Sequence, residues 1–235
     1  MAFNKFTGEE IWQSESMKDQ RSYVSPIVYE LNNKKILLAV TARHLVALSP
    51  ENGEVKWSFN YFNVKEWVHQ PGLIWANTPV FKGNEIYITK GYDHPGVMLT
   101  VADNGLSAKE KYQSNVLDNH HHGLVLHDGF LYGSNWESNA KGYWVCMDWD
   151  TGEIQFEHDW FNKGSIVFAD GMLYIYEERK GNLGLVRPNP EKFDLVSSFQ
   201  VKEGTGPHWA HPFIKNKVLY IRHGDVLMAF DIAKK

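Results

Sequence analysis

The stretches "FTGEEIW" (residues 6–12) and "ENGEVKW" (51–57) share one pattern, in which Gly-Glu is followed by a tryptophan four residues after the glycine. The two tryptophans are 45 residues apart. A third copy, "DTGEIQF" (150–156), has phenylalanine in place of the tryptophan, and "DNGLSAKEKY" (103–112) is a weaker copy. Recurrence at a period of this size indicates a repeat architecture.

Short apolar segments flank these copies on both sides. "HLVALSP", "VMLTVAD" and "WVCMDWD" precede them, and hairpin patterns such as "TPVFKGNEIYITKG" and "SIVFADGMLYIYEE" follow. Two apolar runs around a tight Gly, Asn or Asp turn are typical of a β-hairpin. Four short antiparallel strands in each repeat predict a β-propeller blade. A β-sandwich fits the strand content but does not explain the regular repeat.

The repeats predict an all-β fold with about five four-stranded antiparallel blades in a single propeller domain over residues 1–235. We expect residues 1–14 to be the outer strand of a partial blade, and the blades to span approximately 21–60, 73–114, 119–158, 164–200 and 208–235. The chain ends with "LMAFDIAKK", inside the motif with which it begins. Either the first strand closes the last blade, or the chain is a piece of a longer ring, which we favour.

Composition excludes several classes of function. The chain is 43% apolar and 14% aromatic, which is too apolar for a disordered protein. The net charge of −4 and the lack of a basic run do not indicate a nucleic-acid surface. No apolar run approaches the roughly 20 residues of a membrane span, and "MAFNKFTGEE" is not a signal peptide. The lone Cys146 excludes an internal disulfide and a cysteine-based zinc cluster.

In a four-stranded meander, every second connection lies at the same end of the blade. The long polar connections of this sequence alternate with minimal turns. Long loops are therefore expected at one end of the blades and tight turns at the other. Nine of the eleven histidines fall in the long connections: His44, His69, His94, His120, His121, His122, His208, His211 and His223. A rigid scaffold with its long, polar and aromatic loops on one side typically uses that side for function.

In a propeller the innermost strands of the blades surround a central funnel. The candidate ligand-binding residues are expected to line this funnel or the mouth of the funnel. They are Arg21, Arg43, His44, Asn119, His120, His121, His122, Glu178, Arg179, His208, Trp209, His211, Arg222, His223 and Asp225. The arginines either form an anion site at the mouth or pair with neighbouring carboxylates and carbonyls, and the sequence does not separate these two alternatives.

The "HHH" of residues 120–122 is interpreted as funnel lining rather than as a metal site. Neighbours in an extended segment point to opposite faces, so at most His120 and His122 would face one way, with His121 opposed. A metal ion would need further ligands from another blade, such as His208 or His211. We therefore predict no metal site. Asp148 and Asp150 are likewise interpreted as an ordinary repeat turn, and Trp12 and Trp57 as packing between blades.

The motif in "AFNKFTGEEIW" and "ALSPENGEVKW" resembles the PQQ-like repeat of the quinoprotein alcohol dehydrogenase-like propellers. The longer phrases "DNHH", "CMDW", "GPHWAHP" and "LYIRHGD" are similar to a bacterial branch of these repeat proteins that is related to outer-membrane assembly factors. The resemblance implies a ring of about eight blades, an export signal and an extracytoplasmic location, periplasmic or in the cell envelope. On this basis we expect the chain to be an N-terminally truncated member.

The function predicted first is a non-enzymatic propeller that presents its His-, Arg- and aromatic-rich loop face to a protein partner or small ligand. The first alternative, implied by the resemblance, is a quinoprotein alcohol dehydrogenase that binds PQQ with Ca²⁺. Such enzymes place two neighbouring cysteines beside the cofactor, and this chain has one cysteine. The second alternative is a metal-dependent hydrolase or lyase, with His121 or His211 as the base and Arg222 as the charge stabiliser.

Overall fold

The computed structural model describes residues 1–64 and 74–233. The chain divides into two compact units. Unit 1 comprises Met1–Lys90 and Pro95–Gln113, and unit 2 comprises Gly91–His94 and Ser114–Lys235. His69, one of the loop histidines singled out above, lies outside the described residues.

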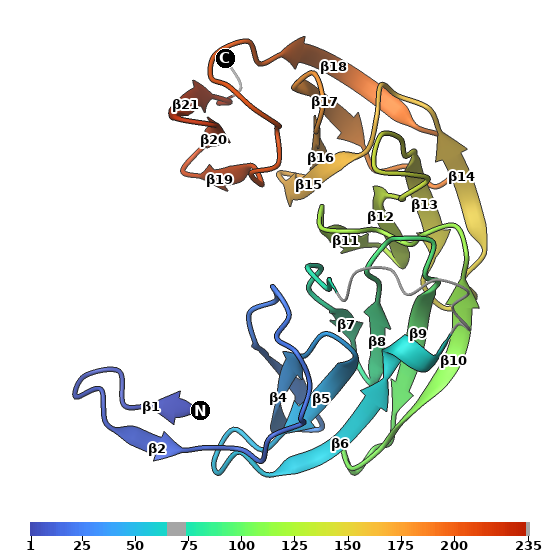
Figure 1. Cartoon of the computed structure of the whole chain (residues 1–235). Coiled ribbons are helices and arrows are strands. Elements are labelled where there is room, and N and C mark those ends of the chain that lie inside the picture. The colour runs from blue at the N-terminus through green and yellow to red at the C-terminus, as the bar shows by residue number, and fades with distance from the viewer. Residues whose placement is uncertain (65–73, 234–235) are drawn as a thin grey trace. The chain divides into compact units, whose positions relative to one another are not determined.

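Unit 1 contains two four-stranded antiparallel sheets and a two-stranded hairpin (Figure 1). The first sheet consists of β3 (Ile27–Leu31), β4 (Lys34–Val40), β5 (His44–Leu48) and β6 (Val55–Asn60). The second consists of β7 (Val80–Lys82), β8 (Glu85–Ile88), β9 (Gly96–Val101) and β10 (Ala108–Ser114). The hairpin pairs β1 (Ala2–Phe3) with β2 (Glu10–Trp12), and a short 3-10 helix, η1 (Tyr61–Val64), follows β6.

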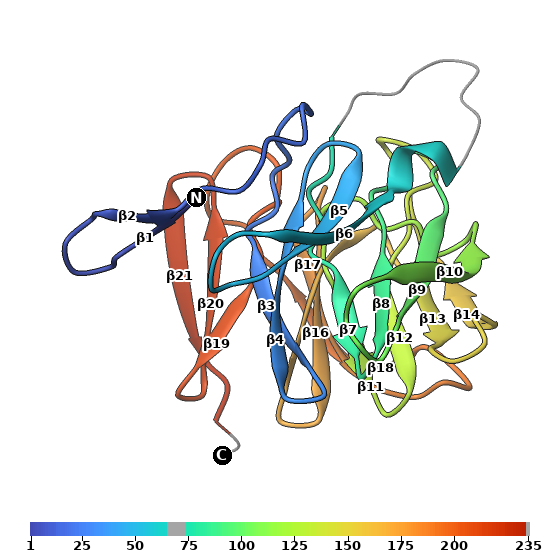
Figure 2. The ribbon, with the colours of Figure 1, turned by 90° about the horizontal axis from the view of Figure 1, so that it is seen from below.

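Unit 2 contains two four-stranded sheets and a three-stranded sheet, again with neighbouring strands antiparallel and in chain order (Figure 2). The first sheet consists of β11 (Leu124–His127), β12 (Phe130–Ser134), β13 (Trp144–Asp148) and β14 (Ile154–His158). The second consists of β15 (Gly164–Ala169), β16 (Met172–Glu177), β17 (Asn182–Arg187) and β18 (Asp194–Gln200). The third consists of β19 (Phe213–Lys215), β20 (Val218–His223) and β21 (Val226–Asp231).

Sheets that follow one another within a unit share a hydrophobic core. In unit 1, Tyr29 and Trp57 of the first sheet join Ile86 and Leu99 of the second in one buried cluster. In unit 2, β11–β14 and β15–β18 share a cluster that contains Cys146, and β15–β18 share another with β19–β21. Alternating apolar residues on the facing sides of the sheets account for this packing.

The Gly-Glu motif forms the same turn in each of its three full copies. The backbone N–H of Gly8, Gly53 and Gly152 donates to the carbonyl four residues earlier, on Asn4, Ser49 and Asp148 respectively. All three glycines have φ between 73° and 76°, a conformation that glycine adopts without steric cost. The Asp148 carboxylate accepts from the backbone N–H of Asp150 and Thr151, so "DWDTGE" is an ordinary repeat turn.

The prediction of an all-β, propeller-like fold built from four-stranded antiparallel sheets is confirmed. Its cause is the turn chemistry, because positive-φ residues stand at the tight hairpins, as in Asn32-Asn33, Asp128-Gly129 and Asp170-Gly171. The exact division into blades and the central funnel stay predictions. Among the described residues, the structure contains no helix of the length and apolarity needed to cross a membrane.

Candidate functional site

Glu178 lies where three segments of unit 2 meet, immediately after the end of β16. Its backbone N–H donates to the carbonyl of Lys163, which precedes β15. Its own carbonyl accepts from the backbone N–H of His208, in the connection between β18 and β19. The side chain is 6% exposed. These backbone bonds fix the position of a buried carboxylate under the loop-rich end of the sheets.

The histidine run reaches Glu178 because residues 119–123 form a bend instead of extended chain. The Asn119 side-chain oxygen accepts from the backbone N–H of His122, and Gly123 adopts φ 78° before β11 begins. The rings of His121 and His122 consequently lie side by side, with centroids 3.9 Å apart. The expectation that His121 points away from His122 is therefore wrong, because the period-2 alternation of a strand does not apply to a bend.

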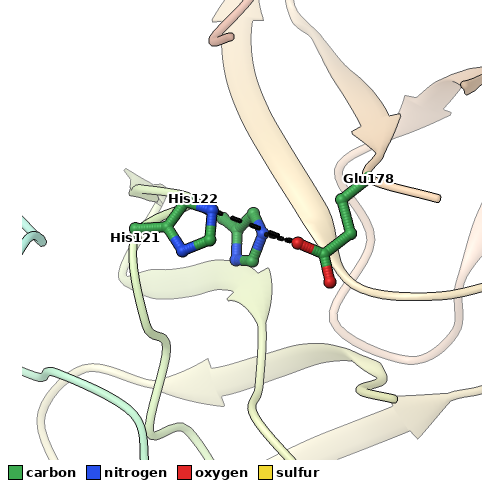
Figure 3. Close-up of side chains that lie close together, drawn as sticks. All are labelled: His121, His122 and Glu178. Atoms are coloured by element: carbon green, nitrogen blue, oxygen red, sulfur yellow. Dashed lines mark hydrogen bonds and ion pairs between the residues drawn. The ribbon is translucent and has the colours of Figure 1, made fainter. Parts of the chain in front are cut away.

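Both imidazoles lie on the same side of the Glu178 carboxylate (Figure 3). His122 is fully buried, and its Nε2–H donates to Glu178 Oε2 at 3.0 Å. His121 Nε2 is 4.0 Å from the same oxygen. The Trp209 indole N–H donates to that oxygen as well, at 3.1 Å. Two imidazoles and an indole thus converge on a single carboxylate oxygen.

Lys163 neutralises the other carboxylate oxygen. Its ammonium group is 3.1 Å from Glu178 Oε1, and the Lys163 side chain is 2% exposed. It also donates to the carbonyls of Ser138 and Lys141. The three protons of the ammonium group therefore have three acceptors, as a buried ammonium requires.

These contacts determine the protonation states at the site. Burial by itself would raise the pKa of Glu178, but the hydrogen bond from His122 and the charge of Lys163 outweigh it and lower the pKa to about 2. Burial, together with the neighbouring histidines, lowers the pKa of His121 to about 3. Burial also lowers the pKa of His122, against the opposing effect of Glu178. At neutral pH the carboxylate is ionised and both rings are neutral.

Trp209 and His211 form the exposed rim above this buried group. The Trp209 side chain is 56% exposed although its N–H is tied to Glu178, and its ring meets that of His121 edge-on. His211 Nε2 lies 2.8 Å from the carbonyl oxygen of His121, to which it donates. The rim is therefore an exposed aromatic ring held by a buried carboxylate and bordered by histidines.

His208 and His223 form a second, separate pair in unit 2. Their rings stack with centroids 3.6 Å apart, and a hydrogen bond joins His208 Nδ1 to the Tyr176 hydroxyl. His223 Nδ1 and Nε2 each lie 2.7 Å from a carbonyl oxygen, of Glu203 and Gly206 respectively. This pair fastens the loop between β18 and β19, because both nitrogens of His223 meet carbonyls of that loop and His208 Nδ1 meets Tyr176.

Two candidates in unit 1, Arg43 and His44, belong to a salt-bridge network. Asp19, whose side chain is 2% exposed, accepts from Arg43 Nη1 at 2.8 Å and from His44 Nδ1 at 3.0 Å. Burial opposes ionisation of Asp19, but hydrogen bonds from the side chains of Thr41 and His44 and from the backbone of Gln20 and Arg43 prevail and hold its pKa far below the ordinary value. Arg43 and His44 are thus paired, which favours the structural alternative for them. Arg21 is exposed and forms a β-bridge with Thr41.

The other candidates of unit 2 lie around these groups without pointing at Glu178. The Asn119 amide donates to the carbonyl of Ser134, and His120 contacts the ring of Tyr92. Arg179 donates to the carbonyl of Ala140, and Arg222 to the carbonyl of Gly224 in its own turn. Asp225 is exposed in the same turn.

Sequence reasoning missed Lys163 and Asp19. Both stand in the long connections, and a lysine or aspartate in a polar loop is normally exposed. The available signal for Lys163 was Glu178, because a buried carboxylate requires an opposite charge, whereas Arg43 is 35% exposed and gave no such signal for Asp19.

The residues do not fit the part of a quinoprotein site that the resemblance implied. Cys146 is fully buried in the middle of β13, where it packs with Tyr132 and Ile175. Burial raises the pKa of its thiol to about 12. As the single cysteine, it cannot supply the pair that such enzymes place beside PQQ. In contrast, His121, His122 and Glu178 carry atoms suited to a metal ion, all within 4.8 Å of one another.

Comparison with known proteins identifies the repeat family. The family model described as outer membrane protein assembly factor BamB matches residues 1–158. The chain belongs to this family of PQQ-like repeat propellers.

An uncharacterized protein of Rickettsia conorii, RC0314, is 29% identical over 202 residues, which are 80% of this chain and 45% of the relative. RP232 of Rickettsia prowazekii is 23% identical over 68% of this chain and 36% of its own length. The chain thus spans less than half the length of these two relatives.

Solved structures agree with the fold. BamB from Moraxella catarrhalis is similar with a TM-score of 0.53 and 12% identity, over 87% of this chain and 56% of that one. A putative 6-phosphogluconolactonase from Bacteroides uniformis is similar with a TM-score of 0.56 and 12% identity, over 87% of this chain and 65% of that one. An assembly factor and a putative enzyme share the fold, so the fold by itself does not assign an activity.

Proposed function

We propose that the chain is a non-enzymatic binding module that presents the loop-rich face of unit 2 to a protein partner in the cell envelope. Membership of a family described by outer membrane protein assembly supports an extracytoplasmic, bacterial setting for this role. The resemblance of the repeats implies the same setting. The two enzymatic alternatives have weaker support, because the cysteine pair is missing and Arg222 bonds to its own turn.

The observation that carries the proposal is that the Trp209 ring is exposed and at the same time held in place by a hydrogen bond to Glu178. This large aromatic side chain is 56% exposed, yet its N–H is bonded to a carboxylate that is almost fully buried. Tryptophan is enriched among the few residues that dominate binding energies at protein interfaces. A ring that is already held in place loses little conformational entropy when a partner covers it. Polar groups on His121 and His211 border the ring, in the way that a polar rim borders an interface core.

Site-specific photocrosslinking tests the proposal in cells of the organism that encodes the chain. A photoreactive phenylalanine analogue at position 209 is expected to crosslink a defined envelope protein. The same analogue at Phe199, exposed on β18, is the matched control and is expected to crosslink none. With the captured protein purified, Trp209→Ala is expected to weaken binding by about 2 kcal/mol or more, close to 30-fold.

Two results would reject this proposal. One is equal crosslinking from positions 209 and 199, which would indicate non-specific contact. The other is unchanged affinity of the Trp209→Ala variant for the captured protein. Stabilisation of the chain by PQQ with Ca²⁺, measured as a shift in Tm, would favour the quinoprotein alternative instead.

A further inference from the structure

His121, His122 and Glu178 each place one metal-binding atom in the same small space, and these three atoms lie within 4.8 Å of one another (Figure 3). Around a zinc ion, bonds to nitrogen and oxygen are about 2.0–2.2 Å long, so two ligands of a tetrahedral ion lie roughly 3.4 Å apart. The two distances to Glu178 Oε2, 3.0 Å from His122 and 4.0 Å from His121, bracket this value. Bringing the longer distance to this value requires the His121 ring, which is 22% exposed, to move towards Glu178 when the ion binds.

The His121 ring presents an unsatisfied nitrogen to this space. His121 Nδ1 is 3.0 Å from His120 Nδ1, so a proton shared by these two atoms accounts for one side of the ring. Its Nε2 is buried and forms no hydrogen bond with a described residue. The 4.0 Å separation from Glu178 Oε2 is too long for a hydrogen bond. With that proton on His121 Nδ1, Nε2 carries a lone pair on the side of the Glu178 carboxylate, and a cation between the two atoms satisfies both.

We propose that His121, His122 and Glu178 bind a divalent cation of the zinc class. Two imidazoles and one carboxylate favour zinc or a neighbouring transition metal over Mg²⁺ and Ca²⁺, which prefer oxygen ligands. On binding, His122 exchanges its Nε2–H···Oε2 hydrogen bond for an Nε2–metal bond, and its ring proton resides on Nδ1. Three protein ligands leave a fourth position for water or a bound group.

Lys163 and Trp209 orient the Glu178 carboxylate for binding an ion. Lys163 holds Oε1 at 3.1 Å, which leaves Oε2 as the oxygen available to an ion. The Trp209 N–H bonds to Oε2 and fixes the rotation of the carboxylate. Hydrogen bonds of this kind to a metal-ligating carboxylate orient it, and their loss typically lowers metal affinity about 10–100-fold. The proposal concerns ion binding alone and does not depend on the partner role of Trp209.

Metal titration of the whole chain tests this site. The protein is freed of metal with a chelator and then titrated with Zn²⁺ by calorimetry and with Co²⁺ by visible absorption. We expect one saturable equivalent of Zn²⁺ and the intense visible bands of four-coordinate Co²⁺. His121→Ala is expected to lower the Zn²⁺ affinity at least about 10-fold and to abolish those bands. Because His121 is partly exposed, this variant should keep its cooperative unfolding.

His127→Ala is the matched control, since His127 is similarly exposed but pairs with Asp128 in the β11–β12 turn. It should bind Zn²⁺ like the unchanged chain. A His121→Ala protein that folds and binds one equivalent with unchanged affinity would overturn the proposal. An equal loss in both variants, or the lack of any saturable binding by the unchanged chain, would overturn it as well. If His121→Ala does not unfold cooperatively, His121→Gln is titrated in its place with the same expected loss.

Discussion

Lys163 Nζ lies 3.1 Å from Glu178 Oε1, and the two side chains are only 2% and 6% exposed. Removing one partner of a buried pair leaves an uncompensated charge, which typically costs about 3–5 kcal/mol. We expect Lys163→Met to lower the free energy of unfolding of the metal-free protein by roughly that amount, measured by urea denaturation. Replacing both partners by apolar residues of similar size, in Lys163→Met with Glu178→Leu, should restore much of the loss.

Lys56 provides the control for this pair. It bonds to Glu54 at 2.7 Å, but the Glu54 side chain is 59% exposed. Exposed pairs contribute about 0–1 kcal/mol, so Lys56→Met should change the unfolding free energy little. A double variant at positions 163 and 178 that is as unstable as Lys163→Met would show that packing, rather than charge, stabilises this part of the site.

The raised pKa of Asp118 should make the free energy of unfolding depend on pH. Its carboxylate accepts from the backbone N–H of Trp136 at 2.8 Å, yet burial, with a contribution from Asp93, raises its pKa to about 7. Because the pKa is higher in the folded state, its contribution to stability is fully present below about pH 4 and is lost as pH rises towards 7. Asp118→Asn removes this loss and keeps the acceptor oxygen.

The unfolding free energy of Asp118→Asn should therefore match that of the unchanged chain at pH 4 and exceed it at pH 8, by roughly 1–3 kcal/mol. Chemical denaturation at pH 4, 6 and 8 measures the difference. Glu137→Gln, at an exposed carboxylate of the same unit, should show no such trend. A constant loss of stability at every pH in Asp118→Asn would contradict the raised pKa of Asp118.

The sequence predicts the sheets of this chain better than it predicts the site. Strand positions follow from local signals, namely positive-φ residues at the turns and apolar alternation between them, which act within a few residues. His122 and Glu178 are both predicted as site residues, but their contact depends on the bend at 119–123 and joins residues that are 56 apart in the chain. The burial of Lys163 likewise depends on distant groups, because Glu178 and the carbonyls of Ser138 and Lys141 accept its protons. Such contacts depend on tertiary packing and leave no local pattern.

His223 is expected to stabilise the loop between β18 and β19. Both ring nitrogens lie 2.7 Å from carbonyl oxygens, of Glu203 and Gly206, and His223 is 6% exposed. A neutral imidazole has one N–H, so one of these contacts is a hydrogen bond, and losing it together with the stacking on His208 should lower the unfolding free energy of His223→Ala by roughly 1–3 kcal/mol. Hydrogen exchange of the amides of residues 203–208 should speed up. His211→Ala, at an exposed histidine, should cost less than about 1 kcal/mol, and equal effects of the two variants would contradict this role.

The repeat turn can require glycine for its positive φ or because a Cβ has no space there, and Gly53 and Gly8 distinguish these two reasons. Both have positive φ, 73° and 76°, and both begin the Gly-Glu pair. A Cβ added at Gly53 would lie 2.3 Å from Trp12 Cε3, whereas one added at Gly8 would meet no atom within 4 Å. Gly8→Ala should therefore carry only the conformational cost of positive φ, about 1–2 kcal/mol.

Gly53→Ala should carry that cost and also displace Trp12, whose N–H bonds to the carbonyl of Pro50. We expect it to lower the unfolding free energy by at least about 1 kcal/mol more than Gly8→Ala, measured by urea denaturation of both variants. Equal costs for the two variants would show that backbone conformation alone requires glycine in this motif.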